Sequence, residues 1–260
     1  MSLRDRSELP TAKRVVVKVG SSSISGPNEA KIEFLVDALA KAHSRGTQVI
    51  LVSSGAIATG MPLLGFNQKP DDLSTSQALA AVGQSRLISR YQQSLERFGI
   101  IAGQVLLTSG DLDAAETRNN AKSAMDKLLS LGVLPIVNEN DTVATQEIRF
   151  GDNDRLAALV AILVDADALV LLSDIDALYD MPPTKPDAKR ITQVAFGENL
   201  DGIEVGGSST AVGTGGAVTK VGAAKVATES GVAVLLTSTD LVAEALEGAA
   251  VGTWFAARGN

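Results

Sequence analysis

The hydrophobic positions of this chain form short apolar runs that alternate with longer segments that are apolar on one face only. The runs are rich in valine, leucine and isoleucine, which is typical of strands buried on both faces of a parallel sheet. We predict strands at residues 15–19, 48–53, 100–107, 133–137, 168–172, 232–236 and 252–255. Apolar residues at helical spacing predict one helix between Asn28, as its N-cap, and Gly46, just after its end, and further helices at residues 77–98, 119–131, 156–164, 217–230 and 241–246.

The order of these elements predicts an α/β fold. The strand at 15–19, the helix after it and the strand at 48–53 make a strand–helix–strand unit, which implies parallel pairing and a right-handed crossover. The chain shows no linker, low-complexity tract or repeat. We therefore predict a single domain over residues 1–260, in which a mostly parallel sheet lies between helical layers.

Three segments between these elements lack both patterns. Residues 60–76 are polar and proline-containing and predict a long loop, a kind of segment that is often functional or mobile. Residues 145–150 alternate like a short strand, and residues 179–190 are typical of a surface flap. Gly83 lies inside a predicted helix, where glycine costs about 1 kcal/mol relative to alanine. Close packing or the approach of a ligand would explain it.

Composition narrows the class of protein. The net charge of −7 argues against a general nucleic-acid or anionic membrane surface, although it permits a local basic pocket for an anion. There is no cysteine, which excludes disulfides and thiolate metal sites. The single histidine, His43, has polar neighbours and cannot form a zinc site. The sequence lacks a signal-peptide pattern and a membrane-spanning run, so we expect a cytoplasmic protein.

Polar residues stand at the carboxyl ends of several predicted strands. They are Lys18, Ser54, the segment 138–141, Ser173 and Asp174. In a parallel sheet these ends lie along one edge, where ligands bind. Lys18 follows a buried valine run and precedes Gly20 and three serines. Two hypotheses stay open for it: a lysine aimed at phosphate, or a lysine that only extends its amine to solvent at the sheet edge.

Glycine turns and a second lysine favour the phosphate hypothesis. Gly213, Gly215 and Gly216 precede Lys220 and a helix, and Asp154 lies at the start of another helix. This set suits phosphoryl transfer, which depends on positioning and charge neutralisation more than on covalent chemistry. The sequence has neither a P-loop motif nor a complete Rossmann glycine motif, and one poorly placed histidine makes a serine–histidine triad implausible.

Seven motifs in order over nearly the whole chain resemble the amino acid kinase family, and within it the kinases that act on glutamate. They are V-V-V-K-V-G-S-S, V-S-S-G-A-I-A, A-A-V-G-Q-S-R-L, V-N-E-N-D-T-V-A, G-D-N-D-R-L-A-A, S-D-I-D-A-L-Y and G-T-G-G-A-V-T-K. The resemblance implies a three-layer αβα sandwich. It also implies transfer of the γ-phosphoryl group of ATP to the γ-carboxylate of L-glutamate, which is the first step of proline biosynthesis.

The resemblance also implies a role for each matching residue. Lys18 and Lys220 would neutralise charge on the transferred group, and Asp154 would hold both lysines. Glutamate would be bound by Ser54, Gly55, Asn138, Asp141 and Asn153. The nucleotide would be bound by Lys18, Ser173, Asp174, Thr214, Gly215, Gly216, Ala217, Val218, Thr219 and Lys220. Asp141 has the charge needed to pair with the α-ammonium group of glutamate, and the acceptor carboxylate is already ionised at neutral pH, so no general base is needed.

Further expectations follow from the same resemblance. ATP and Mg²⁺ would be required, and the motifs identify no obligatory protein ligand for the metal, which ATP oxygens and water could hold. L-Proline would act as a feedback inhibitor, and the chain would form dimers or tetramers. The sequence departs from the family in carrying Ser173 in place of the usual threonine, in a shortened segment after Tyr179, and in lacking a carboxy-terminal PUA domain. Two alternatives remain: a family member acting on another carboxylate, carbamate or nucleotide phosphate, and a non-catalytic amino acid sensor.

Overall fold

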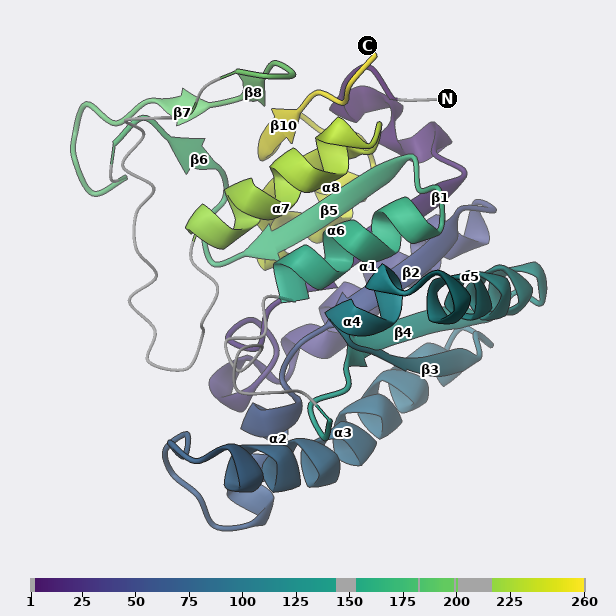
Figure 1. Cartoon of the computed structure of the whole chain (residues 1–260). Helices are drawn as coiled ribbons and strands as arrows, with labels where there is room; N and C mark the ends of the chain where they lie inside the picture. Colours follow the sequence, from purple (N-terminus) through teal and green to yellow (C-terminus); the bar gives the residue numbers. More distant parts are fainter. Residues whose placement is uncertain (1–2, 144–152, 182, 199, 201–216, 260) are drawn as a thin grey trace.

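An eight-stranded, mostly parallel sheet forms the centre of the computed structural model, which describes residues 3–143, 153–181, 183–198, 200 and 217–259 (Figure 1). The strand order is β3-β4-β2-β1-β5-β9-β10-β8. These strands are β1 (Arg14–Val19), β2 (Gln48–Ser53), β3 (Ala102–Leu107), β4 (Leu134–Glu139), β5 (Ala168–Ser173), β8 (Gln193–Val194), β9 (Ala233–Ser238) and β10 (Thr253–Phe255). The first six strands in that order pair in parallel, and β10 pairs antiparallel to β9. The predicted fold class is thus confirmed.

Helices cover both faces of this sheet. They are α1 (Lys31–Ser44), α2 (Ala56–Leu63), α3 (Leu73–Glu96), α4 (Ser109–Asp113), α5 (Ala115–Ser130), α6 (Asn153–Leu163), α7 (Ala217–Glu229) and α8 (Val242–Leu246), with the 3-10 helices η1 (Arg6–Thr11), η2 (Gly26–Asn28) and η4 (Thr239–Leu241). A separate two-stranded hairpin, β6 (Leu178–Tyr179) with β7 (Arg190–Ile191), bounds the segment predicted as a flap. No helix in the described ranges is long and apolar enough to span a bilayer.

Two hydrophobic cores, one on each face of the sheet, define the layers. Val15, Val17 and Val19 belong to the core that α1, α3 and α8 cover, whereas Val16 belongs to the core that α4, α5, α6 and α7 cover. This division follows from the strand period of two residues. It places Lys18 on the same face as Val16, towards α6 and α7. The valine run of β1 therefore decides which helices can reach its lysine.

Two local predictions around the first helix have different outcomes. Asn28 is not the N-cap of α1: it lies in η2, its Nδ2 donates to the carbonyl of Ser22 at 2.8 Å, and Ala30 occupies the N-cap position without a side-chain hydrogen bond. The short 3-10 helix intervenes because Pro27 favours that turn. Gly46 does follow the end of the helix, with φ +90°, a conformation that favours glycine.

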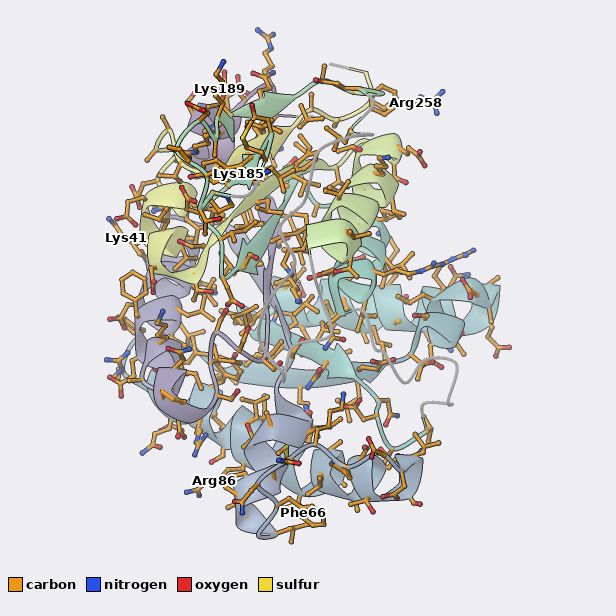
Figure 2. All side chains as sticks on the ribbon, turned by 90° about the vertical axis from the view of Figure 1, so that its left-hand side faces the viewer. Lys41, Phe66, Arg86, Lys185, Lys189 and Arg258 are labelled. Carbon is orange, nitrogen blue, oxygen red and sulfur yellow. The ribbon has the colours of Figure 1, made fainter. Side chains whose placement is uncertain are left out.

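The predicted loop at 60–76 is wrong in part. Helix α2 occupies its first residues, and α3 begins at Leu73, where Asp72 accepts a hydrogen bond from the backbone N–H of Thr75 at 2.7 Å. Helices α2 and α3 cross so closely that a Cβ added at Gly83 would lie 1.8 Å from the carbonyl oxygen of Ala56. Gly83 is thus explained by close helix packing, one of the two explanations predicted. Phe66 lies at this end of the molecule, away from Arg258 (Figure 2).

Other helix boundaries shift by a few residues. Helix α5 begins at Ala115, before the predicted start at residue 119, and α4, which was not predicted, precedes it with Thr108 and Asp111 forming a capping box. The region from Thr108 to Arg118 is polar, so periodicity gave no signal there. The strand predicted at 145–150 lies outside the described residues.

Candidate active site

Lys18, near the carboxyl end of β1, is buried with only 4% of its surface exposed. Its neighbour in the register on one side is Val52 of β2 and on the other Leu171 of β5, so the lysine lies in the middle of the sheet. The turn that follows runs close to the amine, because a Cβ added at Gly20 would lie 3.8 Å from Lys18 Nζ. A buried ammonium at this depth requires a partner of opposite charge.

That partner is Asp154, which also binds the second predicted lysine. Lys18 Nζ lies 2.6 Å from Asp154 Oδ1, and Lys220 Nζ lies 3.1 Å from Asp154 Oδ2. The hydroxyl of Thr219 donates to Asp154 Oδ2 at 2.9 Å. We call Lys18, Asp154 and Lys220 the lysine–aspartate centre. It joins β1 to the first turns of α6 and α7, which pack against each other on this face of the sheet (Figure 1).

The electrostatics of this centre favour an anion. Burial acts to raise the pKa of the Asp154 carboxyl, but the charges of Lys18 and Lys220 outweigh it, and the pKa lies below its usual value. Asp154 is therefore ionised at neutral pH, and two ammonium groups around one carboxylate leave a net positive charge. The N-terminal end of α7 adds to this positive potential through the helix dipole.

A second polar group lies at the ends of β2 and β4. Asn153 Nδ2 donates to Ser54 Oγ at 2.8 Å and approaches Asn138 Oδ1 at 3.3 Å. Asn138 Nδ2 in turn donates to Gln84 Oε1 on α3 at 2.7 Å. We call Ser54, Gln84, Asn138 and Asn153 the amide cluster. Since Asn153 and Asp154 are consecutive residues of α6, this cluster directly adjoins the lysine–aspartate centre.

The amide cluster leaves particular atoms uncommitted. Asn153 is buried, and its Oδ1 has no hydrogen-bond partner among the residues described. A buried acceptor without a partner is costly unless a ligand satisfies it. The amide cluster therefore offers an acceptor to a donor group such as an ammonium.

Gly55 and Asp141 complete the predicted acceptor site. Gly55 begins α2 with φ +104°, a backbone conformation that favours glycine at the sharp turn after β2. Asp141, two residues beyond β4, lines a cavity of about 300 Å³ together with Gln84. Burial raises the pKa of Asp141 to about 6, although the charge of Lys69 opposes the rise.

The turn after β1 is tied to the end of β5. The hydroxyl of Ser22 donates to both carboxylate oxygens of Asp174 at 3.1 Å, and the hydroxyl of Ser23 donates to Asp174 Oδ1 at 3.3 Å. Asp174 follows Ser173, the last residue of β5. The two residues predicted to bind nucleotide thus lie beside the serine turn that follows Lys18.

The remaining predicted nucleotide residues fall at or before the start of α7. Ala217, Val218, Thr219 and Lys220 form its first turn, with Val218 72% exposed. Thr214, Gly215 and Gly216 lie outside the described residues. His43 lies on α1, which covers the face of the sheet opposite to α6 and α7.

Gln84 is the site residue that the sequence analysis missed. It follows Gly83 inside the motif A-A-V-G-Q-S-R-L, yet nothing in helical periodicity separates it from an ordinary surface glutamine. The close approach of α2 and α3 at Gly83 brings this part of α3 to the end of β4. The conspicuous glycine was the only local signal.

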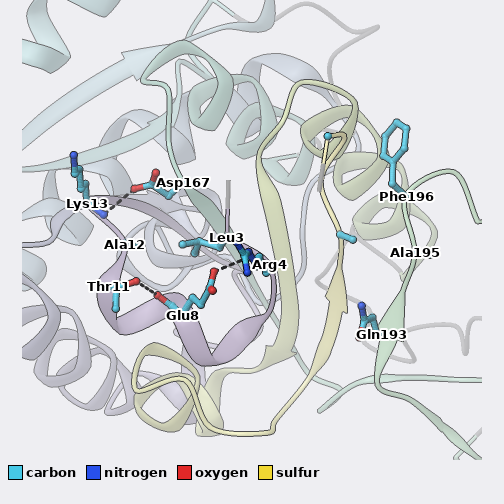
Figure 3. Close-up of a pocket in the computed structure, with 12 residues that line it drawn as sticks. Leu3, Arg4, Glu8, Thr11, Ala12, Lys13, Asp167, Gln193, Ala195 and Phe196 are labelled. Atoms are coloured by element: carbon cyan, nitrogen blue, oxygen red, sulfur yellow. Dashed lines mark hydrogen bonds between the residues drawn. The ribbon is translucent and has the colours of Figure 1, made fainter. Parts of the chain in front are cut away.

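Another cavity, of about 1200 Å³, lies at the amino end of the sheet (Figure 3). Leu3, Lys13, Asp167 and Phe196 are among its lining residues, and Asp167 accepts hydrogen bonds from the backbone N–H groups of Lys13 and Arg14. None of the predicted site residues that the structure describes lines it. The lysine–aspartate centre and the amide cluster therefore remain the candidate site.

The fold, the buried pair of lysines and the glycines that precede the second lysine in the sequence are together typical of an amino acid kinase. A family model described as "Amino acid kinase family" matches residues 13–238, and the chain belongs to that family. At the level of individual proteins, the chain is 66% identical over 258 residues to a protein of Clavibacter sepedonicus named glutamate 5-kinase, and the match covers 99% of this chain and 100% of that one. A glutamate 5-kinase of Leifsonia xyli is 63% identical, with 98% and 95% covered.

Longer relatives and solved structures complete the comparison. A glutamate 5-kinase of Thermobifida fusca is 54% identical, and the match covers 96% of this chain but 66% of that protein. A carbamate kinase from Giardia lamblia bound to AMP-PNP has a TM-score of 0.66 at 19% identity, with 95% and 99% covered. An isopentenyl phosphate kinase has a TM-score of 0.65 at 19% identity, with 93% and 99% covered. At these identities the solved structures support the fold alone.

Proposed function

We propose that this chain transfers the γ-phosphoryl group of ATP to the γ-carboxylate of L-glutamate, giving L-glutamyl 5-phosphate and ADP, in the first step of proline biosynthesis. The observation that carries the proposal is the lysine–aspartate centre, in which Lys18 and Lys220 bind the two oxygens of one carboxylate. Relatives named glutamate 5-kinase, at 63–66% identity along the chain, support glutamate as the acceptor.

The reaction needs charge compensation more than proton transfer. An oxygen of the γ-carboxylate forms a bond to the γ-phosphorus of ATP, and the bond from that phosphorus to the bridging oxygen of ADP breaks. Because the acceptor is ionised at neutral pH, no proton has to be removed. The main obstacle is repulsion between the carboxylate and the triphosphate. Lys18 and Lys220, held by Asp154, offset this repulsion and stabilise charge on the transferred group.

Glutamate binds, in this proposal, across the amide cluster. Ser54 and Gly55 at the end of β2, with Asn138, Asn153 and Asp141, surround it. The unpartnered Oδ1 of Asn153 suits a donor such as the α-ammonium group, and ionised Asp141 suits the same group. A dicarboxylate without the amine would leave these acceptors unsatisfied, which supports selectivity for an amino acid.

The nucleotide binds between Ser173–Asp174 and the start of α7. The residues proposed for it are Lys18, Ser173, Asp174 and the run from Thr214 to Lys220. The backbone N–H groups at the start of α7 suit phosphate oxygens.

Mg²⁺ enters with ATP as part of the substrate. Among the described residues, no three histidine, aspartate or glutamate side chains group into a metal site. Both oxygens of Asp154 already face lysines. Mg²⁺ in kinase sites commonly keeps water and substrate phosphate oxygens as ligands, and we propose the same arrangement here.

The family resemblance supports three further proposals. L-Proline inhibits the enzyme by competing at Ser54 and Asp141, the chain assembles into dimers or tetramers, and residues 1–260 act as one kinase domain in the cytoplasm. An inhibition pattern that does not depend on glutamate concentration would count against a shared site for proline. Light scattering coupled to size-exclusion chromatography measures the assembly.

An ADP-release assay with several acceptors tests the function. We expect turnover with L-glutamate and little or none with L-aspartate, N-acetyl-L-glutamate or UMP. Turnover with another of these acceptors but not with L-glutamate would replace the proposal by a different activity on the same fold. Binding of glutamate without any ADP release would favour an amino acid sensor, although such a sensor would have no need of two buried lysines.

A further inference from the structure

The hydrogen bonds of Asn138 and Asn153 to the backbone determine which way the carboxamide of Gln84 is oriented. The backbone N–H of Glu139 donates to Asn138 Oδ1 at 2.9 Å, so Asn138 must present its Nδ2 to Gln84. Asn153 Nδ2 donates to the backbone carbonyl of Ser53 at 3.4 Å. This contact fixes the Nδ2 of Asn153 on the side that faces Asn138 Oδ1, in agreement with the orientation of Asn138. Only an oxygen can accept from Asn138 Nδ2, so Gln84 uses its Oε1 there and keeps its Nε2 group uncommitted.

Gln84 also lines the cavity that contains Asp141. With Oε1 bound to Asn138, the two N–H donors of Nε2 are the part of Gln84 left for this cavity, and no described residue accepts from them. Among the residues described, the charged groups around the cavity include Asp141, Glu139 and, acting on Asp141, Lys69. Acceptor and donor groups therefore line one small space, as the head group of a zwitterion requires: carboxylate oxygens for an ammonium, and N–H groups for a carboxylate.

We propose that Gln84 is a specificity-determining residue of the acceptor site, whose Nε2 donates to the α-carboxylate of the amino acid while Asp141 pairs with its α-ammonium group. This inference rests on the proposed function and deepens it. Gln84 thus links two tasks: Oε1 orients Asn138, and Nε2 reads the substrate. A residue that only oriented Asn138 would affect all acceptors equally, which gives the proposal its test.

The experiment compares two ligands that differ by the α-carboxylate alone, L-glutamate and 4-aminobutyrate. Dissociation constants are measured by calorimetry on the full chain with a non-hydrolysable ATP analogue, for the wild type and for Gln84→Met, which keeps the side-chain length but removes both polar atoms. A hydrogen bond to a charged group corresponds to about 10- to 100-fold in affinity. We expect Gln84→Met to weaken L-glutamate at least about 10-fold more than 4-aminobutyrate, because loss of the bond to Asn138 affects both ligands alike whereas loss of Nε2 affects L-glutamate alone.

Equal weakening of both ligands, or no weakening of either, would overturn the proposal. The matched control is Gln92→Met, because Gln92 is an exposed glutamine of the same helix and lies outside the lining of the cavity. It should leave both constants within about 3-fold of the wild type, below the scale of one hydrogen bond to a charge.

Gln84→Glu gives a second, independent comparison if the methionine variant does not fold. It keeps an oxygen towards Asn138 and replaces the donor by an anionic acceptor. At pH 8 it should favour the α-amide of L-glutamate over L-glutamate by at least about 10-fold relative to the wild type, because an amide can donate where a carboxylate cannot. An unchanged preference would overturn the proposal. Wild-type ADP release with L-glutamate separates this outcome from failure of the proposed function itself.

Discussion

The lysine–aspartate centre and the amide cluster occupy adjacent positions at one edge of the sheet, but they differ in charge and in how fully their polar atoms are paired. The first consists of three charged groups that are almost fully buried and bind one another directly. The second is neutral, and two of its amide groups keep atoms that no described residue satisfies. Consecutive residues of α6, Asn153 and Asp154, belong one to each group.

This difference suits the lysine–aspartate centre to the transfer of the phosphoryl group and the amide cluster to the choice of the acceptor. Charged groups held by ion pairs in a buried place are suited to an anion that must be stabilised strongly and in one position. Neutral amides discriminate by the direction of donors and acceptors, and a mismatched ligand leaves a buried group unpaired. Changes in the centre should therefore affect the rate and the stability of the fold, whereas changes in the cluster should affect which acceptor binds.

The largest effect is expected for Asp154→Asn. It leaves two buried ammonium groups without their counter-charge, which costs about 3–5 kcal/mol of unfolding free energy. Urea denaturation measures the loss. The control is Asp165→Asn, because Asp165 is 79% exposed in its ion pair with Lys122 and should contribute less than about 1 kcal/mol. Similar losses of unfolding free energy in both variants would show that the buried ion pairs of the centre stabilise the fold no more than an exposed ion pair does.

Lys220→Ala should lower kcat by at least about 100-fold, since it removes one group that stabilises charge on the transferred phosphoryl group. The structure of α7 should persist, because Asp154 keeps Lys18 and the hydroxyl of Thr219. Steady-state kinetics measure kcat. Lys225→Ala, at an exposed position of the same helix, is the control and should keep the wild-type rate. An unchanged kcat in Lys220→Ala would remove Lys220 from catalysis.

A smaller effect is expected at the helix crossing that positions the amide cluster. Gly83→Ala would place a Cβ 1.8 Å from a backbone oxygen of α2, so the helices must move apart. We expect a loss of about 1–3 kcal/mol in unfolding free energy and a higher KM for glutamate, because Gln84 is the next residue. Gly222→Ala on α7 meets nothing within 4 Å and should instead stabilise by up to about 1 kcal/mol. A neutral Gly83→Ala would contradict the tight crossing.

The smallest effect is a pH dependence from Asp141. Because burial raises its pKa to about 6, the carboxyl is neutral below that pH and cannot pair with an ammonium, so kcat/KM for L-glutamate should rise through pH 6. The folded protein holds this proton more tightly than the unfolded chain. Its contribution to stability is therefore present below about pH 4 and lost as the pH rises through 6. In Asp141→Asn both dependences should disappear from pH profiles of kcat/KM and of urea unfolding.

Much of the fold was accessible from the sequence because buried strands leave a strong local signal. The runs at Val15–Val17 and in β2, β5 and β9 were placed to within a residue or two. Helices α2 and α4 were not predicted, since each is too short to show a helical period in the sequence. Asn28 was misplaced because a 3-10 helix took the position expected for the N-cap.

The residues of the candidate site also differ in whether the sequence around them gives a signal. A lysine near the end of a buried strand, and an aspartate and a lysine at helix starts, are conspicuous, so Lys18, Asp154 and Lys220 were predicted as site residues from the sequence. Gln84 was not predicted, since a glutamine on a helix face has no distinctive spacing. Its place in the site follows only from its hydrogen bond with Asn138 near the end of β4.

The sequence by itself determined which strands are buried, and it predicted that their carboxyl ends carry the site and that the chemistry concerns phosphate. The family resemblance implied that one aspartate holds both lysines, but only the tertiary structure gave these contacts, which join residues 66 apart in the case of Lys220, and only it decided which atoms of the neighbouring amides remain for a ligand. The reason is physical. Burial follows from local hydrophobicity, whereas hydrogen-bond direction depends on groups that meet only when distant segments pack.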